Sequence, residues 1–152
     1  MTQPTFRRAR RADLETIVSL LADDGIGKSR ENASLPLDER YMAAFTAVDQ
    51  DPNQYLAVVE IGGAVVGTMQ LTFIPGVSRL GMTRGLIEAV RIAASARGSG
   101  LGQAMFEWAI ETCRERGCGL VQLTTDKARK DAHRFYDRLG FVASHEGYKL
   151  SL

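Results

Sequence analysis

Three glycines occupy alternate positions in the segment RGSGLG, residues 97–102, directly before a stretch with helical spacing. Glycine is found where the backbone needs a positive φ or where another group must come very close to it. The first amides of a helix lack partners within the helix, and the helix dipole makes that end positive. Such a strand-to-helix turn can bind a phosphate group, with Arg97 adding a positive charge. The alternative is a tight turn that binds no ligand.

Two common phosphate-binding motifs do not fit this turn. A P-loop ends in Gly-Lys-Ser/Thr, whereas Gln103 follows the last glycine here. A dinucleotide-binding turn has the spacing G-x-G-x-x-G and follows the first strand of its domain. In this sequence the spacing is G-x-G-x-G, and the turn comes late in the chain, after a predicted antiparallel hairpin. The turn therefore matches neither motif, and these two comparisons leave open which phosphate-bearing ligand it could bind.

The chain around this turn reads as one mixed α/β domain over residues 1–152. β-rich runs predict strands over the ranges 6–10, 55–61, 64–73, 84–94 and 120–125. Helical spacing predicts four helices, which begin at Asp13, at Pro36, at the glycine turn and at residue 131. The last segment, 141–152, reads as a hairpin with its turn near 144–147. The predicted fold class is α/β (α+β), with a central mixed, mostly antiparallel sheet flanked by about four helices.

Composition restricts the classes of function. The 152 residues carry a formal net charge of +1, which gives no sign of broad affinity for nucleic acid or an anionic membrane. The sequence has no apolar run of about 18 residues, and its basic start lacks the apolar segment of a signal peptide. The spacing of Cys113 and Cys118 fits neither a zinc site nor a disulfide framework. We therefore expect both cysteines to pack in the core of a cytoplasmic protein. For the four arginines at positions 7, 8, 10 and 11, we expect a solvated strand edge.

The motifs together resemble the GNAT superfamily of acyl-CoA N-acyltransferases. RGSGLG resembles its R/Q-x-x-G-x-G/A signature, and LIEAVRIAASARGSGLG is similar to its fourth strand running into the pyrophosphate loop. FRRARRAD is similar to its first strand and helix start, and DAHRFYDRLGF to its Ala-x-x-Phe-Tyr-x-x-x-Gly-Phe segment. The similarity follows the family order along essentially the whole chain. It implies acetyl-CoA as the acyl donor, used without a metal.

The resemblance also implies which residues bind the coenzyme. The backbone of Ile92 and Ala93 would pair with the pantetheine arm as an added strand does, which requires the fourth and fifth strands to separate. The remaining coenzyme-binding residues would form the turn and the helix start: Arg97, Gly98, Ser99, Gly100, Leu101, Gly102 and Gln103. The sequence departs from the family pattern at two places. Ala94 stands where proline is common, and Arg129 stands where a coenzyme-contacting asparagine is common, so we do not transfer that role to Arg129.

By the same resemblance, Tyr136 is the general acid that protonates the leaving thiolate. A phenol with an ordinary pKa of about 10 keeps its proton at neutral pH and can deliver it. The alternative is that Tyr136 only extends the apolar face of its predicted helix into the core.

Glu88 is the candidate general base for the amine. In a regular strand its side chain shares a face with Leu86, Val90 and Ile92. A carboxylate among apolar neighbours has its pKa raised by desolvation, towards the range that a base needs. The superfamily often carries a catalytic or water-relaying glutamate at the corresponding place. The alternatives are an exposed or arginine-paired carboxylate, or one that binds the cationic acceptor.

The sequence thus predicts an N-acetyltransferase that acts directly on a primary amine of a small molecule or peptide. The alternative is an acyl-CoA-binding regulatory module without catalysis. The acceptor site would be built from residues 21–45, where Asp23, Asp24 and Glu31 are offset by Lys28 and Arg30. We expect no nucleic-acid or membrane partner. The apolar end of the chain, YKLSL, could pair across the interface of a homodimer.

Overall fold

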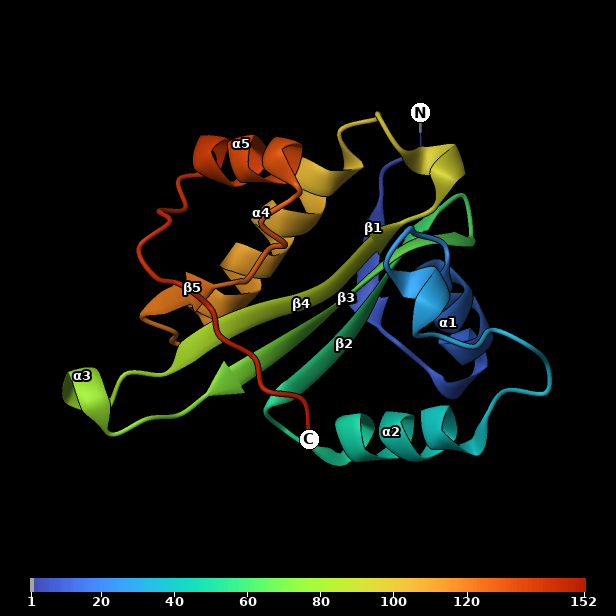
Figure 1. Ribbon diagram of the computed structural model, residues 1–152, viewed down its shortest axis with the longest axis horizontal. Helices are drawn as coiled ribbons and strands as arrows, with labels where there is room; N and C mark the ends of the chain where they lie inside the picture. The colour runs from blue at the N-terminus through green and yellow to red at the C-terminus, as the bar shows by residue number, and fades with distance from the viewer. Residues whose placement is uncertain (1) are drawn as a thin grey trace.

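A five-stranded sheet forms the centre of the computed structural model, which describes residues 2–152 (Figure 1). Its strands lie side by side in chain order: β1 (Thr5–Arg8), β2 (Gln54–Ile61), β3 (Ala64–Ile74), β4 (Arg84–Ile92) and β5 (Leu120–Gln122). The first four strands pair antiparallel, whereas β5 runs parallel to β4. The predicted mixed, mostly antiparallel sheet is therefore confirmed.

Helices cover both faces of the sheet. They are α1 (Leu14–Ala22), α2 (Glu39–Gln50), the short α3 (Ser78–Gly81), α4 (Leu101–Glu115) and α5 (Lys130–Arg138). Figure 1 shows α1 and α2 on one side and α4 and α5 on the other. On the first side, Val18 and Phe45 pack against Val58 of β2. On the second side, Met105 and Phe106 pack against the buried side chains of β3 and β4.

The starts of the first two helices differ in detail from the predictions. Helix α1 begins after Asp13 as expected, but the Asp13 carboxylate does not cap it. That carboxylate accepts from the Arg10 amide at 2.7 Å and pairs with Arg7 at 2.8 Å. Helix α2 begins at Glu39 rather than at Pro36, because the side chain of Asp38 accepts from the Arg40 amide and caps the helix there.

The C-terminal part of the sheet is smaller than predicted. Strand β5 ends at Gln122 instead of continuing to residue 125. The hairpin expected over 141–152 is absent, and the described residues of this segment form neither strand nor helix. In Figure 1 the segment leaves α5, passes β5 and crosses in front of the sheet to the C-terminus. Its backbone therefore extends no edge of the sheet.

A β-bulge interrupts β4 where the predicted site lies. Thr68 and Gln70 of β3 pair with Arg91 and Glu88, so β4 has one extra residue in this interval. Within it, Ala89 adopts a φ of 53°, which is rare for a residue with a side chain. An extra residue reverses the alternation of side chains beyond it. As a result, Glu88 and Arg91 share the face covered by α1 and α2.

Candidate active site

The glycine turn joins β4 to α4. After Ile92 the chain makes a 3-10 turn over Ala94–Ala96 and then enters the segment of alternating glycines. Gly98 and Gly100 have φ values of +78° and +81°, which a residue with a Cβ adopts only under strain. Helix α4 starts at the next residue, Leu101. The backbone conformation of the turn therefore requires glycine at positions 98 and 100.

The amides of this turn are free to bind an anion. In the described chain, none of the six amides from Gly98 to Gln103 donates a hydrogen bond, and the first helical bond runs from the Ala104 amide to the Gly100 carbonyl. A Cβ placed on Gly98 or Gly100 would meet no atom within 4 Å, so the space beside these residues is open. Consecutive free amides at a helix N-terminus fit a diphosphate group. The turn thus has the donors and the room that the coenzyme needs.

Strands β4 and β5 separate beside this turn. Their last pair joins Leu86 to Gln122, whereas β4 continues to Ile92. Among the described residues, no strand therefore lies on the β5 side of residues 87–92, as the added-strand mode of pantetheine binding requires. Ala93 is already engaged on the other side, where its amide donates to the Val66 carbonyl at 2.8 Å. The separation of the strands is a condition that the sequence did not reveal.

The Arg97 side chain is engaged by other groups than the free amides of residues 98–103. Its Nε donates to the Ile92 carbonyl at 3.1 Å, and one terminal nitrogen lies 3.8 Å from a carboxylate oxygen of Asp23. Asp23 belongs to the loop after α1, and a second residue of this loop, Asp24, pairs with Arg91 of β4, with its Oδ2 2.9 Å from Nε of Arg91. A hydrogen bond from the Gly27 amide and the charge of Arg91 lower the pKa of Asp24. These contacts fix the predicted acceptor loop against β4 and the glycine turn.

Tyr136 is half-buried in an aromatic cluster on α5. Its ring meets those of Phe106 and Phe141 edge to face, with centroids 5.5 and 6.1 Å apart. Burial raises the pKa of the Tyr136 phenol, and the nearby charge of Arg129 offsets part of this effect. The phenol thus keeps its proton over a wider pH range than a free tyrosine. Packing and proton donation are both compatible with this position, so the catalytic role of Tyr136 stays a prediction.

Glu88 lies in surroundings that differ from those expected. Its side chain is exposed, and Ile92, which pairs with Gly67, lies on the opposite face of the sheet. The expectation of a shared face with Val90 and Ile92 is wrong, because the bulge at Ala89 reverses the alternation. Val90 and Ile92 therefore do not surround the Glu88 carboxylate. The carboxylate instead faces the side of the sheet where the loop after α1 lies, and its role as base or binding group stays a prediction.

Of two surface hollows in the described chain, only the smaller one lies at the start of α4. One of about 270 Å³ lies between the start of α4 and α5, lined by Gln103, Phe135, Arg138 and Leu139. A larger one of about 670 Å³ lies between the end of β1 and α2 and is lined by N-terminal arginines together with Phe45 and Asp49. The larger hollow contains none of the predicted site residues. We therefore place the site at the glycine turn, where the free amides and the separated strands meet.

Other sites and segments were also considered. Among residues 2–152, no three His, Cys, Asp or Glu side chains lie close enough together to hold a metal ion. Every helix described is too short or too polar to cross a bilayer. Arg7 pairs with Asp13 and Glu60, and Arg8 lies 4.2 Å above the ring of Tyr55. Half of the N-terminal arginine cluster thus stabilises the fold itself.

The fold and site define an acyltransferase of the GNAT type, and comparison with known families agrees. The model of the acetyltransferase (GNAT) family matches residues 15–141. The chain therefore belongs to the GNAT acetyltransferase family, and its activity is acetyl transfer to an amine.

The chain is similar in sequence to two enzymes of named activity and similar in structure to a solved protein. It is 32% identical over 107 residues to aminoalkylphosphonate N-acetyltransferase of Salmonella typhimurium, which covers 70% of this chain and 69% of that protein. It is 38% identical over 90 residues to glucosamine 6-phosphate N-acetyltransferase of Trypanosoma brucei brucei, 59% of each chain. A transcriptional regulator from Bacillus halodurans C-125 has a structure that superposes with a TM-score of 0.95 at 47% identity, covering 99% of this chain and 100% of that one.

Proposed function

We propose that this protein transfers an acetyl group from acetyl-CoA directly to the primary amine of a small molecule, with both substrates bound together. The observation that carries the proposal is the run of six free amides at the start of α4, beside the separated strands β4 and β5. The amides of residues 98–103 would hold the pyrophosphate, and the open side of β4 up to Ile92 would pair with the pantetheine arm. Acetyl-CoA would supply the activated thioester.

Two side chains would handle the protons. Tyr136 would donate its phenolic proton to the departing thiolate, which its raised pKa supports because the proton remains available at neutral pH. Glu88 would accept the proton of the amine or hold the protonated amine in place. Its exposure on the face that carries the acceptor loop supports contact with a substrate that arrives from solvent. The chain would need no covalent intermediate, because the amine can attack the thioester directly.

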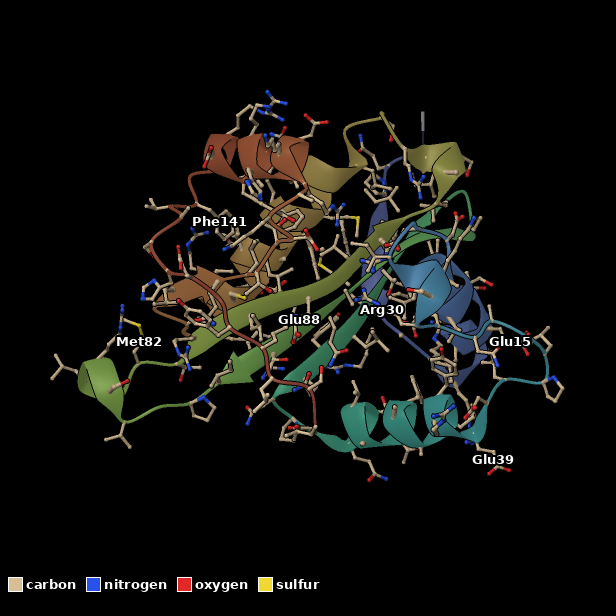
Figure 2. The ribbon with its side chains drawn as sticks, in the orientation of Figure 1. Glu15, Arg30, Glu39, Met82, Glu88 and Phe141 are labelled. Carbon is tan, nitrogen blue, oxygen red and sulfur yellow. The ribbon has the colours of Figure 1, made fainter. Side chains whose placement is uncertain are left out.

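We propose further that the acceptor carries a phosphate or phosphonate group. The two named relatives act on an aminoalkylphosphonate and on glucosamine 6-phosphate, which both combine an amine with such a group. Arg30, in the loop after α1, is exposed and lies near enough to Asp24 to lower the pKa of that carboxyl. Figure 2 shows Arg30 on this loop and Glu88 on β4. Arg30 would bind the anionic group while Glu88 contacts the amine.

Free thiol released from acetyl-CoA measures this activity. We expect turnover with aminoalkylphosphonates and glucosamine 6-phosphate, and at least tenfold lower kcat/KM with glucosamine, which lacks the phosphate. Arg30→Ala should remove this preference, whereas Lys28→Ala, two residues away in the same loop, should retain it. Equal kcat/KM for glucosamine and its phosphate would contradict the anionic acceptor. Release only with peptides or polyamines would contradict the small phosphorylated amine.

A regulatory module that binds acyl-CoA without turnover is the second candidate. It is favoured by one observation, the close structural similarity to a protein described as a transcriptional regulator. The same thiol assay separates the two, because a regulatory module would bind acetyl-CoA in calorimetry yet release no thiol with any amine. The free thiols of Cys113 and Cys118 suit a reducing compartment, and we propose a cytoplasmic location on that ground.

A further inference from the structure

Glu88 stands between two arginines of its own strand, Arg84 and Arg91. Arg84 is four residues away on a regular part of β4, so it shares the face of Glu88, and Arg91 returns to that face after the bulge. A guanidinium beside a carboxylate forms a charge-assisted ion pair, which would block the approach of a cationic amine. Among residues 2–152, however, the exposed Glu88 carboxylate forms no ion pair or hydrogen bond. What the two arginines contact instead therefore decides whether Glu88 is free.

Arg84 is distant and engaged elsewhere. Four residues of extended strand separate its Cα from that of Glu88 by about 13 Å. Its Nη1 donates to Oε1 of Gln122 on the neighbouring strand β5 at 2.8 Å. The Arg84 guanidinium is thus bound to β5 and does not reach Glu88.

Arg91 is close enough to neutralise Glu88. The β3 residues that pair with Arg91 and Glu88 are two positions apart, so the two Cα atoms lie about 7 Å from each other on one face of the sheet. The extended side chain of an arginine spans such a distance. In the structure the guanidinium turns instead to the loop after α1, where Nε lies 2.9 Å from Oδ2 of Asp24. Only 14% of the Arg91 side chain is exposed, so the pair is partly shielded from solvent.

Asp24 holds Arg91 by charge. The buried Nε of Arg91 forms no hydrogen bond in the described chain, although Oδ2 of Asp24 is near, and Nη1 donates to the Val90 carbonyl at 2.9 Å. The other carboxylate oxygen of Asp24 accepts from the Gly27 amide, which fixes the side chain in the loop. Loss of the charge at position 24 would therefore release the guanidinium, while the loop keeps this hydrogen bond.

We propose that Asp24 is a positioning residue that keeps the Arg91 guanidinium away from Glu88, so that the Glu88 carboxylate stays free for the amine. The inference rests on the proposed role of Glu88. A mostly buried guanidinium without a counter-charge is costly. Without the charge of Asp24, Arg91 would therefore turn to Glu88, the carboxylate beside it on β4. Asp24 acts on the amine through these two side chains and needs no contact with the substrate.

A crystal structure of Asp24→Asn tests the inference without acetyl transfer. Asparagine keeps the oxygen that accepts the hydrogen bond of the loop, but it lacks the charge. We expect the Arg91 guanidinium to lie within about 4 Å of the Glu88 carboxylate in this variant. In Asp23→Asn, which removes the neighbouring charge of the same loop, Arg91 should remain beside Asp24. A guanidinium that stays at position 24 or turns to solvent in Asp24→Asn would overturn the proposal.

Kinetics separate this role from attachment of the loop alone. With 2-aminoethylphosphonate as the acceptor, we expect kcat/KM of Asp24→Asn to fall by about fivefold or more, as an ion pair that masks Glu88 would cause, with an unchanged Kd for coenzyme A. The double variant Asp24→Asn/Arg91→Met lacks both charges, so nothing masks Glu88. It should recover to within about twofold of the wild type, a coupling that contacting residues can show.

The double variant gives the opposite result if the ion pair serves only to attach the loop. It would then be at least as impaired as Asp24→Asn, and the proposal would be wrong. A wild-type protein that releases no thiol would contradict the proposed function instead, and the position of Arg91 in the crystal structure of Asp24→Asn would still decide this inference.

Discussion

The two side chains assigned to proton transfer lie in opposite environments. Tyr136 is packed among Phe106, Phe135 and Phe141, whereas Glu88 is exposed on the other face of the sheet from this cluster. A general acid benefits from burial that keeps its proton in place. A carboxylate that must meet a cationic amine from solvent benefits from exposure. The difference between the two positions therefore matches the difference between their proposed roles.

Tyr136→Phe tests the acid. Because only the hydroxyl is lost, we expect kcat to fall by about 100-fold or more, the usual contribution of a positioned general acid, while the Kd for coenzyme A changes little. The raised pKa of the phenol also predicts that wild-type kcat does not decline through loss of this proton below about pH 10. Thiol release and calorimetry measure these quantities. Unchanged kcat in the variant would remove Tyr136 from the mechanism.

Glu88→Gln tests the base. Without the carboxylate, only the fraction of amine that is already neutral can react, and this fraction falls as the pH falls below the pKa of the amine. We therefore expect the ratio of wild-type to variant kcat to grow towards low pH, between pH 9 and pH 6. A variant that changes only KM, equally at every pH, would make Glu88 a binding residue.

At the scale of elements, α4 packs closely on the start of β4. A Cβ at Gly85 would lie 2.4 Å from Sγ and 3.2 Å from Cβ of Cys113, which is fully buried. We expect Gly85→Ala to lower the free energy of unfolding by about 1–3 kcal/mol, because the core there has no room for a methyl group.

Removal of the Cys113 sulfur should relieve that clash. Urea unfolding of Gly85→Ala, Cys113→Ala and the double variant gives the coupling between the two positions. The double variant should be more stable than the sum of the single effects predicts. Purely additive effects would mean that the strand shifts to accommodate the methyl group without involving Cys113.

The elements with strong periodicity were predictable from sequence, and the irregular ones were not. The glycine turn before α4 carries a local signal, and so does the turn Gly62–Gly63, which joins β2 to β3 with positive φ at both residues, because these conformations need glycine. The bulge at Ala89 has no such signal, since alanine rarely adopts its φ and only the pairing with β3 enforces it. The face of Glu88 was consequently assigned to the wrong neighbours.

The strands near the C-terminus were overpredicted for a related reason. A β-rich pattern shows that a segment can pair, but the partner is set by tertiary structure. Residues 141–152 have the pattern of strands and find no edge within the described chain. Likewise, the ion pair of Asp24 with Arg91 joins positions far apart in sequence, and nothing local identifies it. The acceptor loop could be named from sequence, but its attachment to β4 could not.

At the scale of the whole molecule, the sheet separates two tasks. Helices α4 and α5 cover one face (Figure 1), and they carry the amides and the phenol that we propose for the donor side. The other face, under α1 and α2, carries Glu88 and the loop that we propose for the acceptor side. The two sides meet where β4 parts from β5. Binding of the donor at the glycine turn is the claim on which the rest of the mechanism depends.

The most direct measurement of that claim is an amide NMR titration of the ¹⁵N-labelled protein with coenzyme A. The account predicts saturable binding, with the largest changes in chemical shift at the amides of residues 98–103, because these donors are free before the ligand arrives. Pantetheine, which lacks the diphosphate, should leave the chemical shifts of the same amides nearly unchanged. The contrary result would be no saturation at millimolar coenzyme A, or changes concentrated elsewhere, such as in the hollow beside Arg10 and Phe45.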